Sequence, residues 1–152
     1  MRVVIGGTFA FLHEGHKALI GKAFELGDYV YIGLTTDKYV HDNKNNWEIP
    51  KYSERRKKVE QFARRYKKKF EIMPLEDKFG PSTTQEFDLI VVSEGTFHTA
   101  EEINKIRKRN GLNPLRIVEV DYVLAKDLKP ISSSRISRGE IGTKGNPTKE
   151  KE

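Results

Sequence analysis

The sequence predicts one α/β domain in which a doubly wound, five-stranded parallel sheet carries helices on both faces. Short runs rich in β-branched residues alternate along the chain with segments whose apolar residues recur at helical spacing. Strands that alternate with helices form parallel sheets covered on both faces. The 152 residues suffice for one ordinary domain with a buried core, and no internal repeat is visible.

The first half of the chain is expected to contain three strands and two helices. The strands are expected at 2–7, 28–35 and 70–75. A helix between the first two is indicated by apolar residues at helical spacing, Leu19, Ile20, Ala23 and Phe24, and should end at Gly27. After a loop, Ser53 should cap a second helix, whose apolar face is Val59, Phe62, Ala63 and Tyr66.

The second half is expected to contribute two strands and two helices. Residues 77–87 predict a loop with a Gly-Pro break and a short helical turn, followed by a central strand at 88–93. Thr99 and Glu102 have capping-box spacing and predict a helix that stops at Asn110-Gly111. A strand at 115–124 and a helix starting in PISSSRISRGEI should complete a domain of residues 1–139, with a polar, disordered tail at 140–152.

Composition excludes several classes of protein. There is no cysteine, so disulfides, thiolate nucleophiles and cysteine-ligated zinc are excluded. The chain shows neither a signal-peptide pattern nor an apolar run long enough to span a membrane, so a cytoplasmic location is expected. Residues 51–69 hold ten basic and two acidic residues, a net +8 that leaves −2 for the remainder. This segment could bind a polyanion or simply be a solvated helix face.

Candidate ligand-binding residues follow the expected strands. GGTF follows the first strand, TTDK the second and SEGT the fourth, and ISSS comes after the fifth. Ligands of doubly wound sheets bind at the carboxyl ends of the strands, near the point where the strand order reverses. Four loops are therefore expected to converge on one site.

The stretch GGTFAFLHEGHK places two histidines, His13 and His16, three residues apart at the start of a helix. A metal site is disfavoured because no third ligand has suitable spacing and the zincin pattern is broken. A phosphate site fits better: Gly7 lets backbone amides approach a ligand, Gly15 allows a sharp turn into the helix, and Lys17 adds a charge at the helix N-terminus. No dinucleotide-binding or P-loop glycine pattern is present.

These residues resemble the H-x-G-H signature of the nucleotidyltransferase superfamily, and PISSSRI resembles its second motif. The resemblance implies a Rossmann-like nucleotidyltransferase fold and transfer of a nucleotidyl group from a nucleoside triphosphate. YSERR, DKFGPS, IVVSEGT and INKIRKRNGLNPL narrow it to the phosphopantetheine adenylyltransferase family of archaeal and eukaryotic type, over residues 2–138. One departure is Ala10, where the superfamily usually has aspartate.

The resemblance implies that ATP and 4′-phosphopantetheine are converted to dephospho-coenzyme A and pyrophosphate, with Mg²⁺ accompanying ATP. It implies no nucleic-acid or membrane partner, and it leaves the oligomeric state open. His16 and Lys17 are expected to stabilise charge on the transferred phosphate, with His13 nearer the leaving phosphates. Lys38 should bridge the two reacting phosphates, and Thr8 with the amide of Phe9 should hold substrate oxygens. The remaining expected ATP contacts are Gly7, Ser93, Glu94, Thr96, Asn104, Arg107, Ile131, Ser132, Ser133, Ser134 and Arg135.

The expected mechanism is in-line attack of a substrate phosphate on the α-phosphorus of ATP. A phosphate monoester has a second pKa of about 6 and needs no general base near neutral pH. The enzyme must then supply positioning and charge stabilisation. Two alternatives remain. One is a related transferase with another acceptor, such as nicotinamide or flavin mononucleotide or glycerol phosphate. The other is a non-catalytic nucleotide- or nucleic-acid-binding module.

Overall fold

The computed structural model describes residues 1–43, 48–121, 123, 125–127, 131, 132, 135, 136 and 138–145. Within them, all five strands lie parallel in one sheet, in the order β3-β2-β1-β4-β5. The chain order reverses at β1, which pairs with both β2 and β4. The strands are β1 Arg2–Gly7, β2 Tyr29–Thr35, β3 Lys69–Leu75, β4 Leu89–Ser93 and β5 Arg116–Val120.

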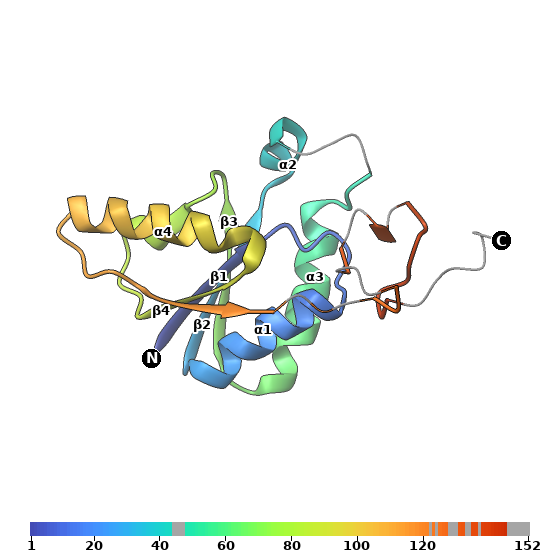
Figure 1. The fold of residues 1–152 in the computed structure, drawn as a ribbon, viewed down its shortest axis with the longest axis horizontal. Helices are drawn as coiled ribbons and strands as arrows, with labels where there is room; N and C mark the ends of the chain where they lie inside the picture. Colours follow the sequence, from blue (N-terminus) through green and yellow to red (C-terminus); the bar gives the residue numbers. More distant parts are fainter. Residues whose placement is uncertain are drawn as a thin grey trace.

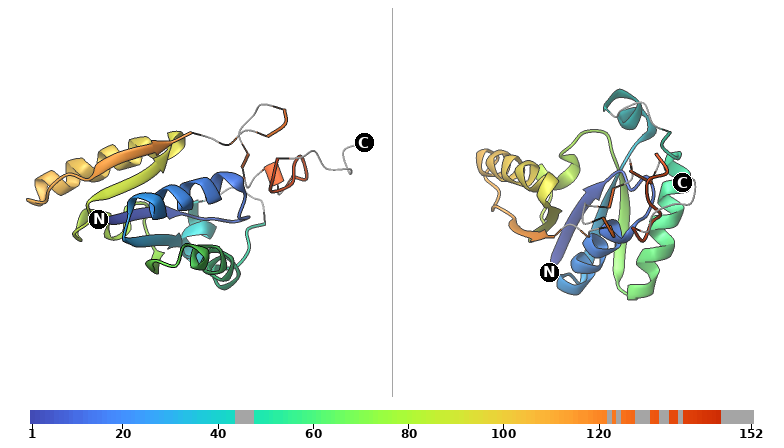
Figure 2. Two further views of the ribbon diagram at one scale, coloured as in Figure 1. Left: turned by 90° about the horizontal axis from the view of Figure 1, so that it is seen from below. Right: turned by 45° about the vertical axis from the view of Figure 1, so that its right-hand side comes forward.

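Helices cover both faces of this sheet (Figures 1 and 2). α1 and α3 pack on one face, around the apolar side chains of Ile20, Phe24 and Val59. α4 covers the other face, where Ala100 and Ile103 pack against β1 and β4. The helical segments are α1 Glu14–Leu26, α2 Asp37–Asn43, α3 Tyr52–Ala63, η1 Arg64–Tyr66, η2 Gly80–Thr83 and α4 Glu94–Arg109. The expected doubly wound α/β fold is confirmed.

Two helix starts differ from the expected ones because the caps lie elsewhere. α3 begins at Tyr52, and the Tyr52 amide donates to the carboxylate of Asp37 on α2, 2.7 Å away, so Ser53 is not its cap. α4 begins directly after β4, with a capping box between Ser93 and Thr96. Thr99 and Glu102, the expected capping pair, lie inside the helix. Its expected end at Asn110 is confirmed, and Gly111 there has φ +75°.

Two other segments also depart from expectation. α2 occupies part of what was expected to be a loop after β2. Residue 140 does not begin a disordered tail: Ile141 is buried against Ala125 and Ile131, and the Glu140 carboxylate pairs with Arg135. Ile141 lies in a polar stretch, and its apolar partners come from the preceding loop. The composition of residues 140–145 alone therefore gave the wrong expectation. Residues 146–152 lie outside the described part of the chain.

Candidate active site

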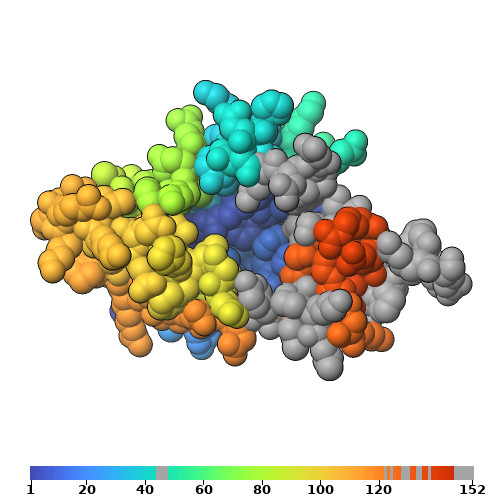
Figure 3. Space-filling view, turned by 45° about the horizontal axis from the view of Figure 1, so that its top comes forward, coloured from blue at the N-terminus to red at the C-terminus, as the bar shows by residue number. Residues whose placement is uncertain are grey.

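A cleft of about 300 Å³ opens at the carboxyl edge of the sheet. Its polar floor is formed where β1 and β2 end, at Gly7, Thr8 and Thr35. Its walls come from α4 and from the segment after β3, and they combine apolar side chains with polar ones such as Asp77 and Lys78. Figure 3 shows this face, with blue atoms of the N-terminal segment in a hollow between the yellow atoms of α4 and the cyan atoms of α2. The cleft lies where the switch in strand order places ligand sites.

His13 and His16 together cap the start of α1. The Nδ1 atom of His13 accepts hydrogen bonds from the amides of Gly15 and His16, at 3.0 and 3.3 Å. In return, Nδ1 of His16 accepts from the amide of His13 at 3.3 Å. The two rings stack with centroids 3.6 Å apart. The histidine pair therefore takes the place of the usual serine and glutamate of a capping box.

This cap determines the chemistry of both rings. Burial lowers the pKa of His13 to about 4. Burial, and then the charge of His13, lower the pKa of His16 to about 3, while a hydrogen bond with the Phe11 backbone acts in the opposite direction. Both rings are therefore neutral at pH 7. Since each Nδ1 accepts a backbone N–H, the ring proton resides on Nε2 in both. Each ring is thus a neutral hydrogen-bond donor and not an acid.

The lowered pKa values predict that acid destabilises the protein through these histidines. The unfolded chain takes up protons near pH 6.5 and the folded chain near 3–4, so stability falls as pH drops below about 6.5. The limiting slope is about 1.4 kcal/mol per pH unit for a fully buried histidine. His13→Asn, which keeps a capping acceptor, should lose less Tm than wild type between pH 7.5 and 5. His98→Asn, at an exposed histidine of α4, should behave as wild type. Identical pH profiles for all three proteins would contradict the assignment.

Gly15 leaves room for the ring of His13. It was expected to turn the chain sharply, but it is not among the described glycines with positive φ. A Cβ at this position would lie 2.9 Å from Cε1 and 3.0 Å from Nδ1 of His13. Such contacts are too close, so any side chain must displace the imidazole.

Gly15→Ala should therefore lower activity with little net change in stability. Alanine favours the helix by up to about 1 kcal/mol over glycine, but the displaced imidazole weakens the hydrogen bonds that cap α1, which costs about as much. We expect kcat to fall at least about tenfold, because a misplacement near 1 Å can cost about 10²-fold, with little change in Tm. Gly21→Ala in the same helix is the matched control, since its Cβ would meet only the hydroxyl end of Tyr66. Wild-type kcat in Gly15→Ala would refute the steric role.

The two sequence motifs come together in the structure. The amide of Glu14 donates to the carbonyl of Thr143 at 3.1 Å, and a Cβ at Gly15 would lie 4.0 Å from the carbonyl oxygen of Ile131. Ile131 of the second motif thus lies beside Gly15 of the first. The hydroxyl of Ser132 accepts from the Arg135 amide, and the Arg135 guanidinium is paired with Asp127 and Glu140. Ser133 and Ser134 lie outside the described residues.

The two candidate lysines lie on different elements. The Nζ atom of Lys17 lies 3.7 Å from Glu14 and 5.7 Å from the ring centroid of Phe62, which places it on the side of α1 that faces α3. Lys38 is exposed on α2, just after β2 and beside Asp37. The structure therefore brings Lys38, but not Lys17, to the loops that follow the strands.

The loop around Thr8 and Phe9 has unusual local geometry. Phe9 is buried with φ +47°, a conformation that L-residues rarely adopt. Its ring meets His16 edge-on, with centroids 5.0 Å apart, and a Cβ at Gly7 would lie 3.1 Å from it. The glycine thus makes room for a side chain that packs against a histidine of the site.

Among the residues after β4, three lie at the start of α4 and two do not. Ser93, Glu94 and Thr96 form its first turn, and Thr96 also lines the cleft. Asn104, by contrast, bonds the backbone of Leu115 through both its amide atoms, at 2.7 and 2.9 Å. It ties α4 to the segment that enters β5, so the structure gives Asn104 a role in the fold, and its contact with ATP stays a prediction.

Arg107, another expected ATP contact, does not line the cleft. It is 2% exposed, and its guanidinium donates to the carbonyls of Ser82, Gln85 and Asn113. It lines a second, polar cavity with Arg2 and Asp88, at the amino ends of β1 and β4. α4 begins at the carboxyl edge of the sheet and Arg107 lies near its other end, so the length of the helix places this arginine at the opposite edge from the histidines.

The basic segment 51–69 is not a uniformly free face. Arg55 is buried, and the Arg65 guanidinium lies 4.0 Å from the centroid of the Phe62 ring. The Nζ atom of Lys68 donates to the carbonyls of Phe24 and Gly27, where it caps the end of α1. Several basic side chains of this segment thus already make contacts within the protein.

Comparison with known proteins identifies the family. The cytidylyltransferase-like family model matches residues 4–139. The phosphopantetheine adenylyltransferase of Methanosarcina acetivorans is 46% identical over 98% of this chain and 97% of its own. The chain belongs to the phosphopantetheine adenylyltransferase family. The expected family and fold are confirmed.

Two further likenesses extend this family assignment. The bifunctional phosphopantetheine adenylyltransferase/NTP phosphatase of Thermoplasma volcanium is 47% identical over 98% of this chain, which spans 45% of that relative's length. A crystal structure of a protein with unknown function from Archaeoglobus fulgidus superposes with a TM-score of 0.73 at 30% identity. That match covers 87% of this chain and all of the other.

Other kinds of site receive little support within the described ranges. No three His, Asp or Glu side chains gather there as ligands for a metal ion, and Ala10 supplies no carboxylate. None of the helices described is both long and apolar enough to cross a membrane.

Proposed function

We propose that the chain transfers the adenylyl group of ATP to 4′-phosphopantetheine, giving dephospho-coenzyme A and pyrophosphate. The observation that carries the proposal is the pair of stacked neutral imidazoles at the start of α1, beside Ile131 and packed against Phe9, which directly follows the cleft residue Thr8. Two adjacent Nε2–H donors at a helix N-terminus suit phosphate oxygens. The names of relatives that match nearly the whole chain support the choice of substrates.

In the proposed reaction, an oxygen of the acceptor phosphate attacks the α-phosphorus of ATP, and the bond to the β-phosphate oxygen breaks. The acceptor is a dianion near neutral pH, so no proton need be removed from it. The histidines, with pKa values of about 4 and 3, donate hydrogen bonds and transfer no proton. A phosphate oxygen would replace the Phe11 backbone as partner of His16. Mg²⁺ would enter with ATP, on the triphosphate.

The cleft supports an acceptor that has both a phosphate and an extended arm. Thr8 and Thr35 lie at its polar end. Leu75 and Phe79, from β3 and the loop after it, and Ile103, from α4, line its apolar part. A phosphate held beside Thr8 could then extend a partly apolar arm along these walls. Phe79 lies within the family motif DKFGPS and was not expected at the site from the sequence.

A transfer assay with matched acceptors tests the proposal. The protein is incubated with Mg²⁺–ATP and 4′-phosphopantetheine, and pyrophosphate and product mass are measured. Dephospho-coenzyme A is expected, and pantetheine without its phosphate should give no product. Turnover only with nicotinamide mononucleotide, flavin mononucleotide or glycerol phosphate would favour a related transferase. Salt-sensitive RNA binding with no pyrophosphate release would favour a binding module.

A further inference from the structure

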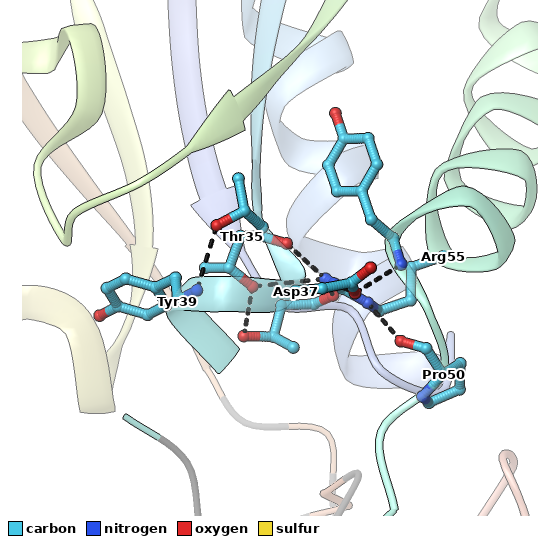
Figure 4. Close-up of polar contacts among 8 residues, drawn as sticks. Thr35, Asp37, Tyr39, Pro50 and Arg55 are labelled. Carbon is cyan, nitrogen blue, oxygen red and sulfur yellow. Dashed lines mark hydrogen bonds and ion pairs between the residues drawn. The ribbon is translucent and has the colours of Figure 1, made fainter. Parts of the chain in front are cut away.

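Arg55 is a buried arginine between α3 and the floor of the cleft. It is 1% exposed, and its guanidinium donates to the carbonyl oxygens of Pro50, Thr8 and Thr35 and to a carboxylate oxygen of Asp37 (Figure 4). The planar fork of arginine is suited to holding several fixed acceptors at once. Burying a guanidinium is costly, so this cluster holds a precise local arrangement.

One arm of the cluster leads to the hydroxyl of Thr8. Nη1 of Arg55 lies 3.3 Å from Oγ1 of Thr35, and the Thr35 hydroxyl donates to Oγ1 of Thr8 at 3.0 Å. Because Thr8 Oγ1 accepts this proton, its own proton remains for another acceptor, and none of the described residues takes it. Nη1 also holds the carbonyl of Thr8, at 3.0 Å. Arg55 thus sets both the backbone position of Thr8 and the direction of its hydroxyl.

The other arm leads to the start of α2. Nη2 of Arg55 contacts Oδ1 of Asp37 at 3.0 Å, and the same oxygen accepts the amide of Tyr52 at 2.7 Å. Asp37 directly precedes Lys38. The guanidinium therefore ties the loop after β1 to the helix that carries the candidate lysine.

We propose that Arg55 is a positioning residue of the transfer reaction. It acts through Thr35 to aim the Thr8 hydroxyl at a phosphate oxygen of a substrate, and through Asp37 to hold α2 beside the cleft. The inference rests on the proposed function. A role in folding alone would change stability but would not couple the kinetic effects of Thr35 and Thr8.

Thr35 offers the sharper test because its substitution is small. Thr35→Val removes the hydroxyl while Nη1 of Arg55 keeps two carbonyl acceptors. We expect kcat to fall about threefold to tenfold, the range of one hydrogen bond, with KM for ATP within about twofold and little change in Tm. Thr35→Ser should restore most of the lost rate. In a Thr8→Val background, Thr35→Val should cause no further loss, because the group through which it acts is gone.

Arg55→Lys tests the guanidinium itself. Lysine keeps the charge but cannot reach all these acceptors, so kcat should fall further than in Thr35→Val. Arg56→Lys, at the next position of α3, is the matched control and should retain wild-type kcat. Its Nη1 donates to the Ile72 carbonyl, at 3.3 Å, and not to Thr8, Thr35 or Asp37. If Arg55→Lys does not fold, the Thr35 series decides.

The wild-type assay separates the two possible failures. An active wild type with an equally active Thr35→Val, or losses at Thr35 and Thr8 that simply add, would overturn the role of Arg55. No transfer by the wild type with any phosphate acceptor would overturn the proposed function and this inference with it.

Discussion

Replacing His16 with alanine is expected to lower kcat by about 10²–10³-fold, the usual cost of losing one preorganised donor to a developing negative charge. The imidazole is held by its bond to the His13 amide, by stacking on His13 and by the edge of Phe9. Little reorganisation is then needed during the reaction. Steady-state kinetics with saturating ATP and phosphopantetheine measure the effect.

The variant also loses one capping bond, so its folding must be measured separately. The loss of a cap costs about 1 kcal/mol, which the Tm from circular dichroism will register. His98→Ala removes an exposed histidine of α4 and should leave kcat unchanged. A folded His16→Ala enzyme with nearly the wild-type kcat would contradict the role of His16 as a hydrogen-bond donor. His16→Asn, which offers an N–H but a different reach, should fall between wild type and alanine.

Lys38→Ala is expected to slow the chemical step by about 10²-fold, since a cation placed between two reacting phosphates offsets their repulsion in the transition state. The side chain is exposed at the start of α2, where Asp37 is anchored by Arg55. An exposed lysine on an anchored helix can swing over the bound phosphates. Rapid-quench single-turnover kinetics with both substrates saturating isolate this step from product release.

A basic residue away from the cleft provides the control for Lys38. Lys58→Ala, on an exposed position of α3, removes the same charge and should leave the single-turnover rate unchanged. If Lys38→Ala matches it, Lys38 belongs to the solvated surface. A rise in KM with an unchanged single-turnover rate would instead indicate ground-state binding alone.

Local patterns predicted the strands because each strand is a short apolar run that can be recognised from its own residues. β1, for example, occupies the expected residues 2–7, and β4 differs by one residue. The helix starts were harder, because a cap can come from a distant residue. Asp37 caps α3 across a gap of 15 positions, so Ser53 was wrongly expected.

The family motifs indicated the candidate site, but they did not reveal how its parts are held. Asn104 and Arg107 lie in a motif shared with the family, yet both bond backbone atoms away from the histidines. Arg55 lies in a basic run, and its sequence context did not distinguish it, because its five acceptors belong to four residues in three separate stretches of chain. Sequence spacing carries no information on such convergence.

By itself, the sequence determined the α/β class, the site at the carboxyl edge and the resemblance to a transferase family. These three conclusions follow from hydrophobic periodicity and from motifs of neighbouring residues, both of which are visible in the sequence without knowledge of the fold. Only the tertiary structure decided that the two histidines cap α1 through Nδ1, that burial keeps both neutral, and that Arg55 reaches Thr8 through Thr35. Tautomer, pKa and hydroxyl direction depend on burial and on distant partners, which exist only once the chain has folded.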